Sequence, residues 1–245
     1  MVETSEVIAS VCLPRDNNEC LGQDHAVLAL LDAYHAHKLG HSWIFYGPSG
    51  VGKATCAYMF AKFLLSKSSK IRDDRILNDA FSLFAKEETV KTDVIGDAKI
   101  NDKFIYDCEH PAIKQILAGA NPNLLIIERE WDEKKGKYKN QIAVDEIRKI
   151  SHFLRLTATD GGYRIVLVDG ADCLNRSGQN AILKVLEEPP QNSLIILISE
   201  TLGMLLPTIR SRCRKLKFNP LSQLLIEQKL RTFNMDLKSD DIPLI

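Results

Sequence analysis

Short, almost entirely apolar segments alternate along the chain with longer segments in which apolar residues recur at helical spacing. Four apolar segments stand out, each four or five residues long and bounded by turn-forming residues: 43–46, 124–127, 165–168 and 194–198. Runs of this length between Gly, Asp, Asn and Pro are typical of buried strands. The alternation predicts βαβ units, whose parallel strands are covered by helices on both faces. The predicted fold class is therefore α/β.

Three helices are predicted between these strands. The first covers residues 54–65 and follows a glycine-rich turn. The second has an apolar residue at every third or fourth position between 144 and 154, which gives it one apolar face. The third carries Ser177 as its expected cap and ends before Pro189.

Three further segments are less regular. Residues 66–111 are rich in Lys and Asp, which favours helices and loops on the outside of the sheet. Residues 128–140 carry mixed charge around Gly136, and we interpret them as an exposed, hairpin-like, solvated loop rather than a binding patch. Residues 221–230 predict one more amphipathic helix.

Composition narrows the class of protein. The 245 residues are 45% apolar, enough for a substantial core, and this excludes a disordered chain. The charges of the 32 basic and 32 acidic side chains cancel, so the formal net charge is zero. This argues against a protein that binds nucleic acid through a large positive electrostatic field of its own. The first residues are polar and no long apolar run follows, so we expect a cytoplasmic protein with no membrane contact.

The cysteines and histidines predict no metal centre. The six cysteines include no C-x-x-C pair, so we expect no zinc and mostly packing roles. Cys108 and His110 form an isolated C-x-H that lacks a second pair of ligands. The remaining histidines are expected to cap, pack or face solvent.

The strongest chemical motif is a glycine-rich loop placed between the first strand and the first helix. Glycines let backbone N–H groups surround phosphates, the helix N-terminus adds its positive end, and Lys53 reaches the outer phosphates. The position after Lys53, where a hydroxyl would bind Mg²⁺, is occupied by Ala54, so only weak metal binding is expected. The candidate cofactor is ATP or ADP, held by Gly47, Pro48, Ser49, Gly50, Val51, Gly52, Lys53, Ala54 and Thr55.

A second strand ends in the acid that such a loop requires. Residues 164–168 lead directly to Asp169, which would face the metal or phosphate. In ATP-hydrolysing proteins of this layout the next residue is usually a glutamate that polarises water, and here it is Gly170. Positioning of metal and water is most of what phosphoryl transfer asks of a protein. We therefore expect little ATP hydrolysis by this chain alone.

One stretch of the neutral chain is locally basic. Between Arg210 and Lys217 there are five basic residues and no acid. An arginine here could present its fork to a phosphate, including one bound by another subunit. On charge alone, a solvated face explains the stretch equally well.

Four blocks of the sequence together resemble the clamp-loader branch of the AAA+ ATPases. They are LGQDH at 21–25, WIFYGPSGVGKAT at 43–55, GGYRIVLVDGADCLNRSGQNAILKVLEEPP at 161–190, and LLPTIRSRC at 205–213. The resemblance implies a RecA-like AAA+ domain over residues 1–219 and the start of a helical lid over 220–245, with a later collar domain apparently missing from this chain. It also implies that Arg212 reaches into the ATP site of a neighbouring subunit and that Ser199 is the polar sensor residue.

The implied partners are the other clamp-loader subunits, the sliding clamp and, through the complex, primer-template DNA. Two alternatives stay open. An autonomous AAA+ motor would be expected to have a glutamate after Asp169. A kinase-like or signalling P-loop protein would need a hydroxyl after Lys53 and would leave the Ser-Arg-Cys block unexplained.

Overall fold

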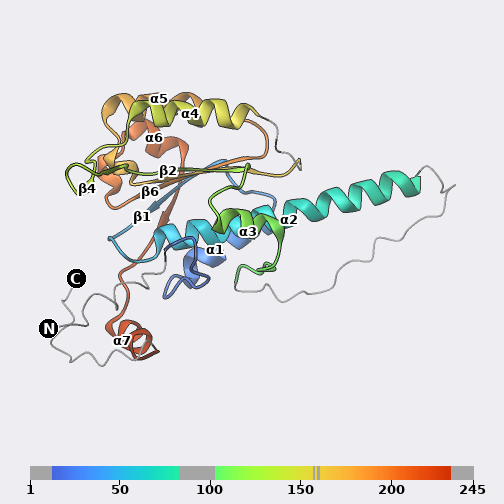
Figure 1. Ribbon diagram of the computed structural model, residues 1–245, viewed down its shortest axis with the longest axis horizontal. Coiled ribbons are helices and arrows are strands. Elements are labelled where there is room, and N and C mark those ends of the chain that lie inside the picture. Colours follow the sequence, from blue (N-terminus) through green and yellow to red (C-terminus); the bar gives the residue numbers. More distant parts are fainter. Residues whose placement is uncertain (1–12, 83–102, 157, 159–160, 233–245) are drawn as a thin grey trace.

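A parallel five-stranded sheet forms the centre of the computed structural model, which describes residues 13–82, 103–156, 158 and 161–232 (Figure 1). Its strands lie in the order β2-β5-β6-β1-β7. Their bounds are β1 Ser42–Tyr46, β2 Leu124–Ile127, β5 Arg164–Asp169, β6 Ser193–Ser199 and β7 Arg214–Lys217. The four strands predicted from apolar runs are confirmed. The fifth, β7, was not predicted and is an edge strand paired with β1.

Helices cover both faces of this sheet, as the α/β prediction requires. In Figure 1, α4, α5 and α6 lie on one face and α1, α2 and α3 on the other. Successive residues of the central strands serve the two sides: Ile165 and Leu167 join the core under α1 and α2, and Val166 and Val168 join the core under α4 and α5. The helices are α1 Asp24–His35, α2 Lys53–Ser82, α3 Pro111–Leu117, α4 Val144–Arg155, α5 Arg176–Glu187, α6 Pro207–Arg212 and α7 Gln223–Thr232.

Two helix predictions need correction. The first helix does not stop near residue 65, because α2 continues to Ser82. Ser177 does not cap α5: the Asn175 side chain accepts a hydrogen bond from the Gly178 N–H at 2.8 Å, and Ser177 lies within the helix. The expected outer segment 66–111 lies partly outside the described residues.

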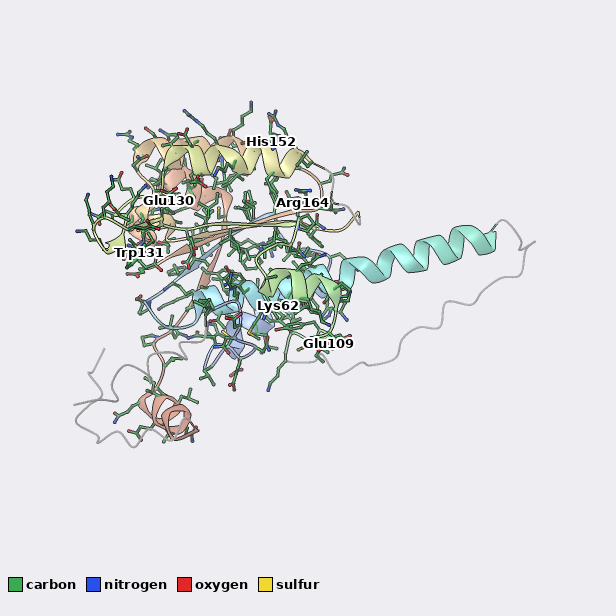
Figure 2. All side chains as sticks on the ribbon, viewed as in Figure 1. Lys62, Glu109, Glu130, Trp131, His152 and Arg164 are labelled. Carbon is green, nitrogen blue, oxygen red and sulfur yellow. The ribbon has the colours of Figure 1, made fainter. Side chains whose placement is uncertain are left out.

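The excursion after β2 is a hairpin, as its charge pattern indicated. Strands β3 (Trp131–Asp132) and β4 (Lys137–Tyr138) pair antiparallel around Gly136. Figure 2 shows Trp131 and Glu130 on this excursion at one end of the molecule, far from Arg164. Trp131 and Tyr138 pack edge to face and are each about half exposed.

Two short 3-10 helices connect strands to helices near the carboxyl ends of the strands. They are η2 (Ala171–Cys173), which follows β5, and η3 (Leu202–Met204), which follows β6. None of the helices in the described part of the chain combines the length and apolar composition that a membrane crossing requires.

Candidate functional site

The glycine-rich loop joins β1 to α2 in a conformation that depends on its glycines. Gly50 and Gly52 have φ values of +75° and +94°, in the region that L side chains rarely adopt. Gly47 is required for a different reason, since a Cβ there would lie 2.3 Å from the backbone oxygen of Phe218. The residue after β7 therefore lies directly against the start of the loop.

Two side chains hold the loop from its core side. The Gln23 amide nitrogen donates to the Val51 oxygen at 3.3 Å, and the Cys20 thiol donates to the Gly52 oxygen at 3.8 Å. Because a trans peptide points its N–H away from its C=O, these contacts turn the following N–H groups toward the opposite side. Gln23 also bonds to both backbone groups of Asn219, so it ties the loop to the segment that precedes α7.

Lys53 is buried and folded back onto its own loop. Its amine donates to the oxygens of Gly47, at 2.7 Å, and Pro48. Burial lowers the pKa of this amine, and the carboxylates of Glu200, Asp169 and Asp172 oppose that shift.

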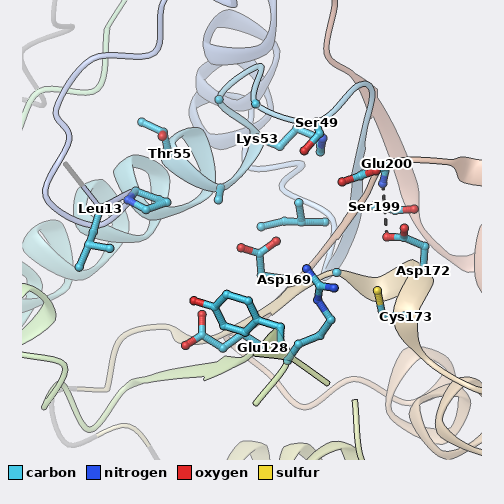
Figure 3. A pocket seen from close by; sticks show the side chains of 18 residues that line it. Leu13, Ser49, Lys53, Thr55, Glu128, Asp169, Asp172, Cys173, Ser199 and Glu200 are labelled. Carbon is cyan, nitrogen blue, oxygen red and sulfur yellow. Dashed lines mark hydrogen bonds between the residues drawn. The ribbon is translucent and has the colours of Figure 1, made fainter. Parts of the chain in front are cut away.

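A pocket of about 600 Å³ opens where the parallel strands end (Figure 3). Glu128 directly follows β2, Asp169 is the last residue of β5, and Glu200 directly follows β6. Figure 3 shows Asp169 between Lys53 and Glu128, and it marks the hydrogen bond in which Asp172 accepts the backbone N–H of Glu200 at 3.3 Å. The remaining lining residues are Leu13, Pro14, Ser49, Gly50, Gly52, Ala54, Thr55, Arg129, Tyr138, Gly170, Cys173, Ile198 and Ser199.

The lining is acidic on balance, because four carboxylates face only Lys53 and Arg129. Burial raises the pKa of Asp169, and the Glu128 charge raises it further, while Lys53 and Arg129 counteract both. Within the described ranges, no three His, Cys, Asp or Glu side chains are arranged to hold a metal ion.

Two positions lack the groups that ATP hydrolysis would use. Ala54 lines the pocket with a methyl group, while the neighbouring Thr55 is 9% exposed. Gly170 has φ +83° at the start of η2, so a glutamate there would be strained. Both positions at which the sequence lacks a group for ATP hydrolysis therefore line this pocket.

Ser199 and Arg212 have different surroundings. Ser199 lines the pocket and is 1% exposed, and its hydroxyl donates to the Thr201 oxygen at 3.2 Å. Arg212, the last residue of α6, is not among the residues that line the pocket; its guanidinium donates to the Thr208 oxygen at 2.9 Å and pairs with Glu187 at 2.8 Å.

The structure thus brings six of the nine predicted loop residues to one pocket with Asp169 and Ser199, whereas Gly47, Pro48 and Val51 are not among the lining residues. Sequence reasoning missed Glu128, Arg129, Glu200 and Tyr138 as pocket residues. Glu128 and Glu200 could have been found from their positions in the sequence, because they directly follow β2 and β6. Ligands of open parallel sheets bind beyond the carboxyl ends of the strands.

A parallel sheet covered on both faces, with a phosphate-type loop after β1, defines a RecA-like domain of the AAA+ class. The sequence matches the family described as DNA polymerase III, delta subunit, over residues 88–222, more than half of the chain. The chain belongs to this family, and the resemblance to clamp-loader proteins is confirmed.

Individual relatives agree with this family. The chain is 31% identical to the DNA polymerase III subunit delta' of Pseudomonas aeruginosa over 74% of this chain and 42% of that protein. It is 26% identical to the gamma subunit of Buchnera aphidicola (subsp. Schizaphis graminum), over 89% of this chain and 49% of that protein. It thus spans less than half the length of these relatives. A solved gamma-subunit-related protein from Thermotoga maritima is 27% identical, with a TM-score of 0.38 over 45% of this chain and 34% of that one.

Proposed function

We propose that this chain is a delta-prime-type subunit of the DNA polymerase III clamp loader, which takes part in ATP-dependent loading of the sliding clamp onto primed DNA. It would act within the holoenzyme, a nucleotidyltransferase complex, and contribute little ATP hydrolysis itself. The observation that carries this proposal is the position of Arg212, outside a pocket that lacks a hydroxyl at Ala54 and a carboxylate at Gly170.

Support for delta-prime over gamma/tau comes from two departures. The motor subunits of this family carry an acid pair after the second strand, whereas here Gly170 follows Asp169. They also carry a four-cysteine zinc module after the phosphate-loop helix, and this sequence has six scattered cysteines without a C-x-x-C pair. The identities of 31% and 26% point the same way.

Within this acidic pocket, the glycine-rich loop is the part that would hold a nucleotide phosphate. The positive φ values of Gly50 and Gly52 make room for a phosphate, and Lys53 supplies the positive charge. A bound ATP or ADP would take these contacts, with Asp169 facing any magnesium that accompanies it. The expected partners are the gamma/tau and delta subunits, the clamp and, through the complex, primer-template DNA.

The test is Arg212→Ala in a clamp loader reconstituted from this subunit and its motor partners. An arginine finger is worth about 10³–10⁵ in kcat at the site that it serves, so clamp- and DNA-stimulated ATPase should lose the share of turnover that passes through that one site, while the other motor sites continue to work. Arg210→Ala, on the same helix, is the matched control and should retain the wild-type rate. Equal rates for Arg212→Ala and wild type would remove the proposed role.

A gamma/tau-like ATPase, or another AAA+ motor that remodels DNA, is the second candidate. The intact loop, with Lys53 and Asp169 in one pocket, favours it. Rapid ATP turnover by the isolated chain, abolished by Lys53→Ala, would support this candidate against the delta-prime proposal.

A further inference from the structure

Arg129 lines the pocket, and its guanidinium makes no hydrogen bond or ion pair with any residue that the structure describes. It lies instead over the ring of Tyr138, with its Cζ atom 5.7 Å from the ring centroid. Contact with a ring face uses none of the guanidinium N–H groups. These groups form a planar fork that matches a phosphate bidentately.

The β3–β4 hairpin holds Arg129 and Tyr138 together. The Lys139 N–H donates to the Glu130 oxygen at 2.8 Å, which continues the pairing beyond the two strands. Trp131 packs edge to face on Tyr138, with the ring centroids 5.0 Å apart, and Figure 2 shows Trp131 and Glu130 on this excursion. The ring that contacts the guanidinium is therefore itself supported by a second aromatic side chain.

Asp169 lies between the glycine-rich loop and the end of β2. The loop follows β1, and the strand order places β5, which ends at Asp169, between β1 and β2. Figure 3 shows Asp169 between Lys53 and Glu128, the residue before Arg129. Burial raises the pKa of Asp169, and Lys53 and Arg129 both counteract that shift. A phosphate chain that starts at the loop and extends past Asp169 therefore has its outer end toward Arg129.

The charge balance of the pocket makes a second cation necessary for a triphosphate. Four carboxylates line the pocket, and Lys53 and Arg129 are its lysine and arginine side chains. Gly50 faces open space, since an added Cβ would meet no atom within 4 Å, so a phosphate has room beside the loop. Ala54 offers no hydroxyl to a magnesium ion that would otherwise help to neutralise the outer phosphates.

We propose that Arg129 binds the outermost phosphate of ATP in this pocket, so that the chain distinguishes ATP from ADP through the β3–β4 hairpin. The inference rests on the proposed function, in which the loop holds a nucleotide. Tyr138 acts as the positioning residue, because its ring holds the guanidinium and leaves the N–H groups for the phosphate.

The experiment is calorimetric titration of the purified full chain with ATP and with ADP, each in the presence of magnesium. A hydrogen bond to a charged group corresponds to about tenfold to a hundredfold in affinity, so Arg129→Ala should raise the Kd for ATP at least about tenfold. The Kd for ADP should stay within about threefold of the wild-type value, because ADP lacks the phosphate that Arg129 contacts. Arg129→Lys keeps the charge without the fork and should give an intermediate Kd for ATP.

Two variants of Tyr138 test the positioning role. Tyr138→Phe keeps the ring face and should bind both nucleotides as the wild type does. Tyr138→Ala removes the ring and should weaken ATP binding but not ADP binding. Equal ATP affinity of Tyr138→Ala and wild type would remove the positioning role of this ring.

Lys134→Ala is the matched control. Lys134 lies in the turn of the same hairpin but does not line the pocket, so its removal takes away the same charge without the same contact. Both Kd values should match those of the wild type. Because Arg129 is exposed, Arg129→Ala should also keep the wild-type Tm, which guards against a folding failure.

The outcomes separate this inference from the proposed function. Unchanged ATP affinity of Arg129→Ala, an equal loss for ATP and ADP, or an equal loss in Lys134→Ala would each overturn the inference. So would a wild-type chain that does not bind ATP. None of these results touches the role of Arg212, which is tested by ATPase rates in the reconstituted complex.

Discussion

Replacing Gly170 by alanine is expected to destabilise this domain by about 1–2 kcal/mol, the cost of placing an L residue in the left-handed region. Gly170 has φ 83° and ψ 45° at the boundary between β5 and η2. A Cβ there would lie 3.7 Å from the Cys173 sulfur, which is ordinary van der Waals contact. The cost therefore comes from the backbone conformation and not from a collision.

The measurement is thermal and urea unfolding of the purified chain. For a domain of this size a loss of 1–2 kcal/mol corresponds to a fall in Tm of about 2–8 °C. Gly203→Ala is the matched control, because Gly203 lies in η3 with φ outside the left-handed region, and an added Cβ would meet only the Thr201 methyl at 3.9 Å. Its effect should stay within about 0.5 kcal/mol. Wild-type stability of Gly170→Ala would refute the conformational argument.

The same strain bears on function. Gly170→Glu places a carboxylate at the position after Asp169. The glutamate would be as strained as alanine in the left-handed backbone conformation, and Ala54 would still lack a hydroxyl. We expect a less stable protein that hydrolyses ATP as slowly as the wild type. A variant with wild-type stability and rapid ATP turnover would show that the backbone at this position does not exclude a working glutamate.

Two further predictions follow from local geometry. Asn175→Ala should lower the free energy of unfolding by about 1 kcal/mol, because it removes the side chain that accepts the Gly178 N–H. Ser177→Ala should change that free energy little, and urea unfolding of the two variants tests which residue caps α5. Asp169→Asn should stabilise the fold above the pKa of Asp169, because burial and Glu128 raise that pKa and the ionised form is the costly one. The gain should disappear as the pH falls below the ordinary Asp value of 3.8, and a constant gain from about pH 8 to about pH 4 would contradict this cause.

The central strands could be predicted because both of their faces are buried. Strands β5 and β6 therefore read as unbroken apolar runs between turn residues. Strand β7 escaped prediction for the opposite reason: Leu216 is its one buried residue, and Arg214, Lys215 and Lys217 are exposed. Charged side chains are common on edge strands, where they discourage pairing with other chains. Its basic residues were therefore interpreted as a solvated face or as a source of a phosphate-binding arginine, and not as a strand.

Part of the candidate site could be predicted from the sequence and part could not. The loop could be predicted because its glycines and Lys53 are adjacent in sequence. Arg129 and Tyr138 were missed because they belong to a charged excursion that has the composition of a solvated loop. Only the sheet order, which places β2 beside β5, brings this excursion to the pocket beside Asp169.

One stretch of chain after β6 connects the pocket to the helix that ends at Arg212. Ser199 and Glu200 line the pocket, and η3 follows at Leu202–Met204 and leads into α6. Asp172 accepts the Glu200 N–H on the pocket side, and Gln179 accepts the Leu206 N–H six residues later. Any movement of this segment in response to a bound phosphate would therefore be limited at both ends by side chains from η2 and α5. Under the proposed function, this rigidity would make the contribution of Arg212 to a neighbour's site depend little on the nucleotide bound in this pocket.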